Sequence, residues 1–167
     1  MGQADLQITK IDGLCELESQ VNKEQLILCD DMQNNFLIIS FDNVHKLGIA
    51  YYDYGTALDF QFSRDGTLLY LGLGKNFLCI DSYENRVLIN DKLQSVFYEL
   101  CCDLNMNYVC VVCELDVYCY YLKKQKWKWG FGDIIVGYNI IDNKKISIIC
   151  DDESKYMLLL EDGSMTE

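Results

Sequence analysis

The chain has 167 residues and a formal net charge of −12, and 50% of its residues are hydrophobic. This composition is typical of a folded acidic protein and argues against direct nucleic-acid binding, because phosphate binding requires a basic surface. No stretch reaches the roughly 18 uninterrupted apolar residues of a membrane span, so we expect no membrane partner.

The cysteines and the N-terminus predict a cytoplasmic protein. The chain contains 9 cysteines, and its first residues, MGQADLQITK, lack the apolar core of a signal peptide. Free thiols persist in a reducing compartment. Cys110 and Cys113 are spaced like metal ligands, but their context is a strand, where residues i and i+3 point to opposite faces. We therefore expect buried thiols, no metal site and no cofactor.

Apolar runs of strand length recur along the chain in four units. The first unit offers strands at residues 14–18, 25–29, 36–41 and 47–52. The second, residues 57–89, places Asp65-Gly66 between alternating apolar runs, which indicates a hairpin because glycine accepts a positive φ. The third offers strands at residues 96–102, 108–113, 117–122 and 127–131. The fourth offers only residues 134–140, 145–150 and 156–160.

The spacing of the turn signals predicts the architecture. The signals repeat about every 40 residues, the period of a propeller blade, near Asn22, Asp65, Asn105 and Asn143. We predict an all-β fold in a single domain spanning residues 1–167: a small propeller-like array of four antiparallel meander sheets. The N-terminal strand, residues 5–11, is expected to close the last sheet, which would remove an exposed edge. A β-sandwich is the alternative.

One segment resembles a known repeat. Residues 60–81, FQFSRDGTLLYLGLGKNFLCID, resemble the blade of WD-repeat-like propellers, in which an apolar strand meets Ser-x-Asp-Gly and then another strand. The sequence departs from that family elsewhere, since it contains no Gly-His pair and no Trp-Asp pair. The resemblance implies a blade of four strands.

The residue types that catalysis requires are scarce. His45 is the only histidine, so a catalytic triad or a His/Cys metal cluster is not expected. The run LGLGKN, residues 71–76, is followed by a strand rather than a helix, which favours a tight turn over a phosphate loop. The aromatic stretch at residues 117–131 is expected to pack in the core, with Trp127 and Trp129 on one face. We expect no enzyme activity.

Carboxylates are expected to gather on one edge of the sheets. In a meander, alternate turns lie at the same edge, and one of the two edges then collects most of the aspartates. Such a surface steers basic partners, and tyrosine adds rigid apolar contacts. The candidate protein-binding residues are Asp30, Asp31, Asp53, Tyr54, Asp116, Asp151, Asp152 and Glu153.

In size, acidity and absence of catalytic patterns, the chain resembles the immunity proteins of bacterial toxin–immunity systems, such as contact-dependent inhibition. This resemblance of general character implies a protein-binding inhibitor. Its partner would be a basic toxin domain, a nuclease, whose active site the acidic edge covers. Two alternatives from other classes remain: a non-catalytic propeller-like scaffold subunit, and a carbohydrate-binding β-propeller.

Overall fold

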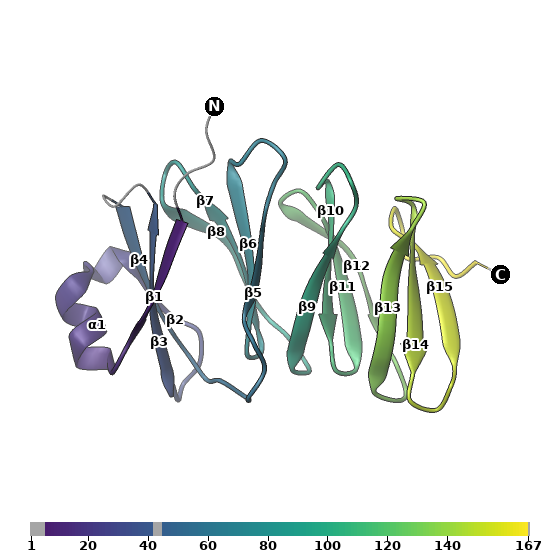
Figure 1. Ribbon diagram of the computed structural model, residues 1–167, viewed down its shortest axis with the longest axis horizontal. Coiled ribbons are helices and arrows are strands. Elements are labelled where there is room, and N and C mark those ends of the chain that lie inside the picture. The colour runs from purple at the N-terminus through teal and green to yellow at the C-terminus, as the bar shows by residue number, and fades with distance from the viewer. Residues whose placement is uncertain (1–5, 42–44, 167) are drawn as a thin grey trace.

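Four β-sheets stand side by side in chain order in the computed structural model, which describes residues 6–41 and 45–166 (Figure 1). The second sheet contains β5 (Asp59–Phe62), β6 (Leu68–Leu73), β7 (Asn76–Asp81) and β8 (Arg86–Lys92). The third contains β9 (Phe97–Cys102), β10 (Tyr108–Cys113), β11 (Asp116–Tyr121) and β12 (Lys124–Gly130). The fourth contains β13 (Ile135–Ile141), β14 (Lys145–Cys150) and β15 (Lys155–Leu159). Consecutive strands pair antiparallel in all three, which confirms the predicted meanders.

The first sheet departs from the prediction. Its order is β1 (Leu6–Ile11), β3 (Asn35–Phe41), β4 (His45–Tyr51) and β2 (Leu26–Leu28), with β2 parallel to β4. The strand predicted at residues 14–18 is wrong, because this segment forms the helix α1 (Leu14–Gln20), followed by the short 3-10 helix η1 (Lys23–Gln25). Leu17 is fully buried, and its Cγ lies 3.2 Å from the position of a Cβ on Gly48, so the helix is held by packing on the sheet.

The predicted closure of the last sheet by the N-terminal strand is also wrong. β1 pairs with β3 in the first sheet, in register from Leu6 opposite Phe41 to Ile11 opposite Phe36. The last sheet is instead extended by residues 164–166, which run along β15. The backbone nitrogen of Leu159 donates to the carbonyl of Ser164 at 2.9 Å, and that of Thr166 donates to the carbonyl of Met157 at 2.8 Å.

The hydrophobic core consists of separate layers between neighbouring elements. Leu17 of α1 packs with Ile38 and Ala50 of the first sheet. The next three layers lie between the first and second, the second and third, and the third and fourth sheets. Cys113 belongs to one of these layers and Cys110 to the next, which confirms that the two thiols face opposite sides of their sheet.

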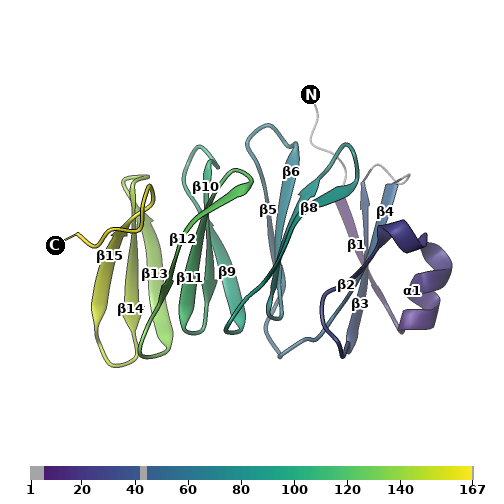
Figure 2. The same ribbon diagram turned by 180° about the vertical axis from the view of Figure 1, so that it is seen from behind.

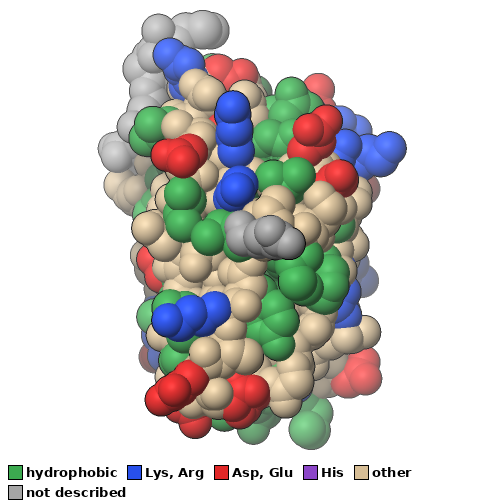
Figure 3. Space-filling view, turned by 90° about the vertical axis from the view of Figure 1, so that its right-hand side faces the viewer, with side chains coloured by type: hydrophobic (Ala, Val, Ile, Leu, Met, Phe, Trp, Pro, Cys, Tyr) green, Lys and Arg blue, Asp and Glu red, His purple; other side chains and the backbone are tan. Residues whose placement is uncertain are grey.

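The two ends of the row differ. α1 covers the outer face of the first sheet, as Figure 2 also shows. Figure 3 looks onto the opposite end, where hydrophobic side chains lie among lysines and carboxylates on the surface. Val136 and Met165 are 58% and 54% exposed, and no element among residues 6–41 and 45–166 covers this end. With seven residues, α1 is the longest helix in those ranges, and none is long enough to cross a membrane.

The connections between strands form two edges. The lower edge in Figure 1 consists of the connections at residues 29–34, 52–58, 74–75, 93–96, 114–115, 131–134 and 151–154. The upper edge consists of those at residues 63–67, 82–85, 103–107, 122–123, 142–144 and 160–164. Backbone hydrogen bonds tie neighbouring lower connections, as from Glu114 N to Val96 O at 2.8 Å and from Asp151 N to Ile134 O at 2.9 Å. Neighbouring upper connections are tied in the same way, from Leu122 N to Asn107 O at 2.9 Å and from Leu160 N to Lys144 O at 2.8 Å, so side chains on either edge stand on a hydrogen-bonded frame.

Candidate protein-binding site

A buried carboxylate organises the lower edge at the first sheet. Asp30 Oδ2 accepts hydrogen bonds from the backbone nitrogen of Tyr52 and from Nδ2 of Asn76, both at 2.9 Å. Its Oδ1 pairs with Nζ of Lys92, and the Asp30 side chain is only 7% exposed. Asp30 therefore joins the connection at residues 29–34 to the connection at residues 52–58 and to the second sheet.

Asp53 fixes the second of these connections. Its Oδ1 accepts a hydrogen bond from the backbone nitrogen of Gly55 at 2.7 Å, and its Oδ2 accepts one from Nδ2 of Asn35 at 3.0 Å. The backbone nitrogen of Asp53 donates to Oδ1 of Asn34 at 2.7 Å. Gly74 closes the arrangement from the second sheet: it has φ +57, and a Cβ there would lie 2.3 Å from the carbonyl oxygen of Tyr52. Hydrogen bonds and close packing therefore hold both connections in this arrangement.

Among the side chains that these connections expose are Asp31, Met32 and Tyr54, which we term the acidic corner. Asp31 is exposed, Met32 is 73% exposed and Tyr54 is 44% exposed. The Tyr54 ring lies 4.9 Å from the Tyr52 ring, edge to face, and Nζ of Lys75 lies 5.1 Å from its centroid. An aromatic ring held at this geometry can add a large apolar contact with little loss of side-chain entropy. Met32 was missed from the sequence, where nothing distinguishes it from a core residue.

Asp116, another candidate from the sequence, is buried in the third sheet. Its Oδ1 lies 3.4 Å from Nζ of Lys128, and its Oδ2 accepts a hydrogen bond from Oγ of Ser95 at 2.8 Å. Nζ of Lys128 also lies 5.1 Å from the centroid of the Tyr118 ring. This ion pair ties β11 to β12.

The remaining candidates lie in the β14–β15 turn. Asp151, Asp152 and Glu153 are exposed. Oδ1 of Asp152 accepts a hydrogen bond from the backbone nitrogen of Ser154 at 2.9 Å, and hydrogen bonds from Ser154 lower the pKa of the Asp152 carboxyl. This turn belongs to the last sheet, whereas the acidic corner belongs to the first. The structure therefore distributes the eight candidate residues along the lower edge instead of gathering them in one cluster.

The buried and half-buried thiols offer little chemistry. Burial raises the pKa of both Cys29 and Cys79 to about 12, which disfavours the reactive thiolate. Among residues 6–41 and 45–166, no group of three or more His, Cys, Asp or Glu side chains is arranged to hold a metal ion. What the lower edge offers is carboxylates and apolar side chains on a fixed frame, which is suited to binding.

Comparison with known proteins shows the fold. Neither a family model nor a curated protein matches the sequence. The Cps50 (Swd1) β-propeller domain of Myceliophteria thermophila is similar in structure, with TM-score 0.52 and 13% identity over 64% of this chain and 36% of that one. Hydrazine synthase of Kuenenia stuttgartiensis has TM-score 0.50 and 14% identity over 65% of this chain and 34% of that one. The computationally designed Ika4 protein has TM-score 0.54 and 15% identity over 68% of this chain and 72% of that one.

The chain spans about a third of the length of the first two of these structures. At such low identities, the likenesses bear on architecture alone. They agree with the stacked antiparallel sheets described above: the chain is an all-β protein with a β-propeller-like array of sheets.

Proposed function

We propose that this chain is a non-catalytic protein-binding module that binds a basic protein surface through the lower edge, with the acidic corner as the centre of the contact. The observation that carries this proposal is the combination of a buried hydrogen-bonded frame and exposed contact residues. The carboxylates of Asp30 and Asp53 are paired or hydrogen-bonded within the frame, whereas Asp31, Met32 and Tyr54 face solvent.

The physical argument rests on preorganisation. Binding energy is concentrated in a few anchors, often aromatic, and it is not spent on ordering loops when these are already fixed. Asp31 can form a charge-assisted hydrogen bond to lysine or arginine beside the apolar surface of Met32 and Tyr54. Asp151, Asp152 and Glu153, farther along the same edge, attract a basic partner from a distance and accelerate its association.

A finer form of the proposal concerns the partner. We infer that the basic partner is a toxin domain with nuclease activity, which the chain neutralises as an immunity protein by covering the active site. The acidity of the lower edge supports this form, since a carboxylate row can occupy a groove that binds phosphates. The propeller-like architecture supports the alternative of a scaffold subunit, whose partner retains its activity when bound.

The test is affinity capture from the native host with the wild-type chain and with the double variant Asp31→Lys and Tyr54→Ala. We expect a basic protein to be retained by the wild type and lost by the double variant. Glu161→Lys is the matched control, because Glu161 is an exposed carboxylate on the upper edge and its substitution changes the charge equally. Equal retention by the wild type and the double variant would contradict the proposal.

The activity of the purified partner then distinguishes the immunity-protein hypothesis from the scaffold hypothesis. If the partner is a nuclease, adding the chain at equal concentration should abolish hydrolysis of RNA or DNA, and the double variant should restore it. A partner that keeps its activity in the complex would favour the scaffold and overturn the immunity form.

A further inference from the structure

The upper edge carries a groove that the proposed function does not use. A cavity of about 480 Å³ lies between the turns at residues 63–67, 103–107 and 122–123. A second cavity of about 490 Å³ adjoins it, since both are lined by Asp65 and Leu122, and it extends to Lys123 and Lys124. We term the two together the upper groove. It crosses from the second sheet to the third, so its walls come from turns far apart in the sequence.

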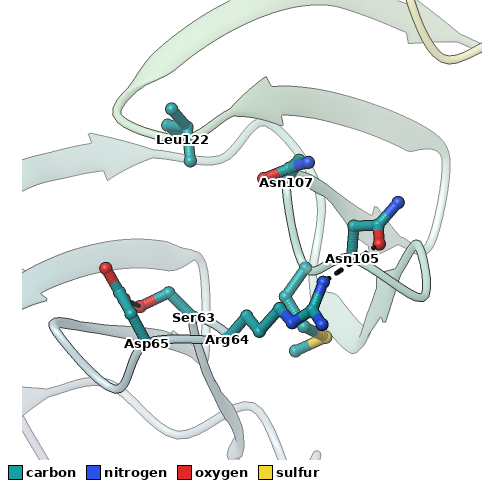
Figure 4. Close-up of a pocket in the computed structure, with 7 residues that line it drawn as sticks. Ser63, Arg64, Asp65, Asn105, Asn107 and Leu122 are labelled. Atoms are coloured by element: carbon teal, nitrogen blue, oxygen red, sulfur yellow. Dashed lines mark hydrogen bonds between the residues drawn. The ribbon is translucent and has the colours of Figure 1, made fainter.

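Cationic side chains at both ends of the upper groove are available to a ligand. Arg64 makes one hydrogen bond within the described ranges, a long one of 3.5 Å to Oδ1 of Asn105. Figure 4 shows Arg64 extending toward Asn105 and away from the carboxylate of Asp65. The ion pairs among residues 6–41 and 45–166 are Arg86–Glu84, Lys92–Asp30 and Lys128–Asp116, so Arg64, Lys123 and Lys124 are not paired there.

The carboxylates near the groove accept hydrogen bonds from residues of their own turns. Oδ1 of Asp65 accepts hydrogen bonds from Oγ of Ser63 at 2.7 Å and from the nitrogen and Oγ1 of Thr67 at 3.0 and 2.8 Å. The buried Asp103 accepts hydrogen bonds from the backbone nitrogens of Asn107 and Tyr108, both at 2.7 Å. These carboxylates fix the two turns, and among the described residues they form no ion pair with Arg64, Lys123 or Lys124.

The apolar wall of the groove has an unusual backbone. Met106 and Leu122 have positive φ angles of 55° and 52°, and both line the groove. The other non-glycine residues with positive φ in the described ranges are Asn, Asp or Glu. Large apolar side chains rarely adopt this conformation, because it brings Cβ close to the backbone carbonyl. Both side chains line the groove: Met106 lines the cavity beside Arg64, and Leu122 lines both cavities, including the one that reaches Lys123 and Lys124.

We infer that the upper groove binds an acidic segment of a partner protein, in an extended conformation, with an apolar residue between carboxylates. One ligand carboxylate pairs with the guanidinium of Arg64, which can form two parallel hydrogen bonds, and the amide groups of Asn105 and Asn107 lie beside it. A second pairs with Lys123 or Lys124, and the apolar residue covers Met106 and Leu122. The chain then has two edges of opposite preference and can bridge a basic and an acidic partner.

The probe is a short fluorescein-labelled peptide in which glutamate and leucine alternate, titrated with the purified chain and followed by fluorescence anisotropy. We expect saturable binding, weakened about tenfold by Arg64→Ala through loss of a charge-assisted hydrogen bond. Lys123→Ala with Lys124→Ala should weaken binding by a similar factor. Circular dichroism and urea unfolding confirm that each variant is folded.

Arg86→Ala is the matched control. Arg86 lies at the start of β8 on the same edge, but its Nη2 is paired with Oε2 of Glu84 at 2.9 Å, and its removal changes the net charge equally. We expect this variant to bind the peptide as the wild type does. Absence of binding, an unchanged affinity of Arg64→Ala, or equal losses for Arg64→Ala and Arg86→Ala would overturn the inference.

The inference is separable from the proposed function. The double variant Asp31→Lys and Tyr54→Ala alters the lower edge only, so it should bind the glutamate–leucine peptide at least as well as the wild type. A peptide in which lysine replaces glutamate should be insensitive to Arg64→Ala. If the lower-edge variant lost the peptide and Arg64→Ala kept it, the groove would not be the binding site.

Discussion

The ring of Phe97, at the start of β9, packs directly on the backbone of Gly72 in β6: a Cβ on Gly72 would lie 2.2 Å from Cε2 and Cζ of that ring. Phe97 is fully buried, as are Tyr70 and Phe77, which flank Gly72 in the second sheet. This contact sets how closely the second and third sheets approach. The upper groove, whose walls come from these two sheets, depends on that spacing.

We expect Gly72→Ala to destabilise the protein by about 1–3 kcal/mol, because the added methyl group overpacks a filled layer. The free energy of unfolding in urea measures this change. Gly132→Ala is the control, because nothing lies within 4 Å of a Cβ at Gly132. A loss of stability no larger for Gly72→Ala than for Gly132→Ala would show that the sheets shift apart freely.

Removing Asp116 should be costly, because its partner Lys128 is only 25% exposed. We expect Asp116→Ala to lower the free energy of unfolding by about 2–4 kcal/mol, since it leaves a half-buried ammonium and the Ser95 hydroxyl without their acceptor. Arg86→Ala removes an ion pair whose side chains are 65% and 62% exposed, and it should cost less than about 1 kcal/mol. Similar losses in the two variants would contradict this assignment.

The turn at Asp65 should make stability sensitive to acid. Hydrogen bonds from Ser63 and Thr67 lower the pKa of Asp65 from its ordinary value of 3.8, so the folded state favours the carboxylate. The resulting stabilisation is complete above pH 3.8 and is lost as the pH falls through the lowered pKa. The difference in unfolding free energy between wild type and Asp65→Asn should therefore be constant near neutrality and shrink below that pH. A difference that grows on acidification would show the opposite sign.

Thiol labelling should be selective. Cys15 is exposed on α1, whereas burial raises the pKa of Cys79, Cys101 and Cys102 to about 12 and disfavours their thiolates. We expect iodoacetamide to modify Cys15 first in the folded protein, and the buried thiols only after unfolding, as mass spectrometry of the digest would show. Cys15→Ser should remove the rapid labelling of the folded protein. Rapid labelling of Cys79 in this variant would contradict the burial of Cys79 in the second sheet.

The last three sheets could be predicted because their signals are local. Asp65-Gly66 marks a hairpin between strands that are neighbours in the sequence, and the tight turn at Gly74 and Lys75 follows the same rule. The alternation of a strand places Val117 and Cys119 on one face of the third sheet and Tyr118 and Tyr120 on the other. The expectation that Trp127 and Trp129 pack in the core is likewise confirmed.

The first sheet could not be predicted because its determinants are distant in sequence. The segment at residues 14–20 has no side-chain cap at Gly13, and it becomes helical where Leu17 packs on Gly48. No local signal shows that Leu6 pairs with Phe41. For the site, the sequence shows how many carboxylates lie near the lower edge but not that Asp30 is paired with Lys92. It therefore could not distinguish the carboxylates that hold the frame together from those that are exposed.

Because the core is layered, the stability of this chain is close to a sum of contributions from each sheet and from each interface between neighbouring elements. Each layer joins only neighbouring elements, so a local opening is opposed by the interfaces on either side of the sheet that opens. Within residues 6–41 and 45–166, the last sheet is packed on one face, whereas the first lies between α1 and the second sheet. The acidic corner and the upper groove both stand on sheets that are packed on two faces. Fraying of β13–β15 therefore leaves the acidic corner on the first sheet intact. It loosens the upper groove, because the third sheet loses the packing on its outer face and the hydrogen bond from the backbone nitrogen of Leu104 to Oδ1 of Asn143 at 3.0 Å.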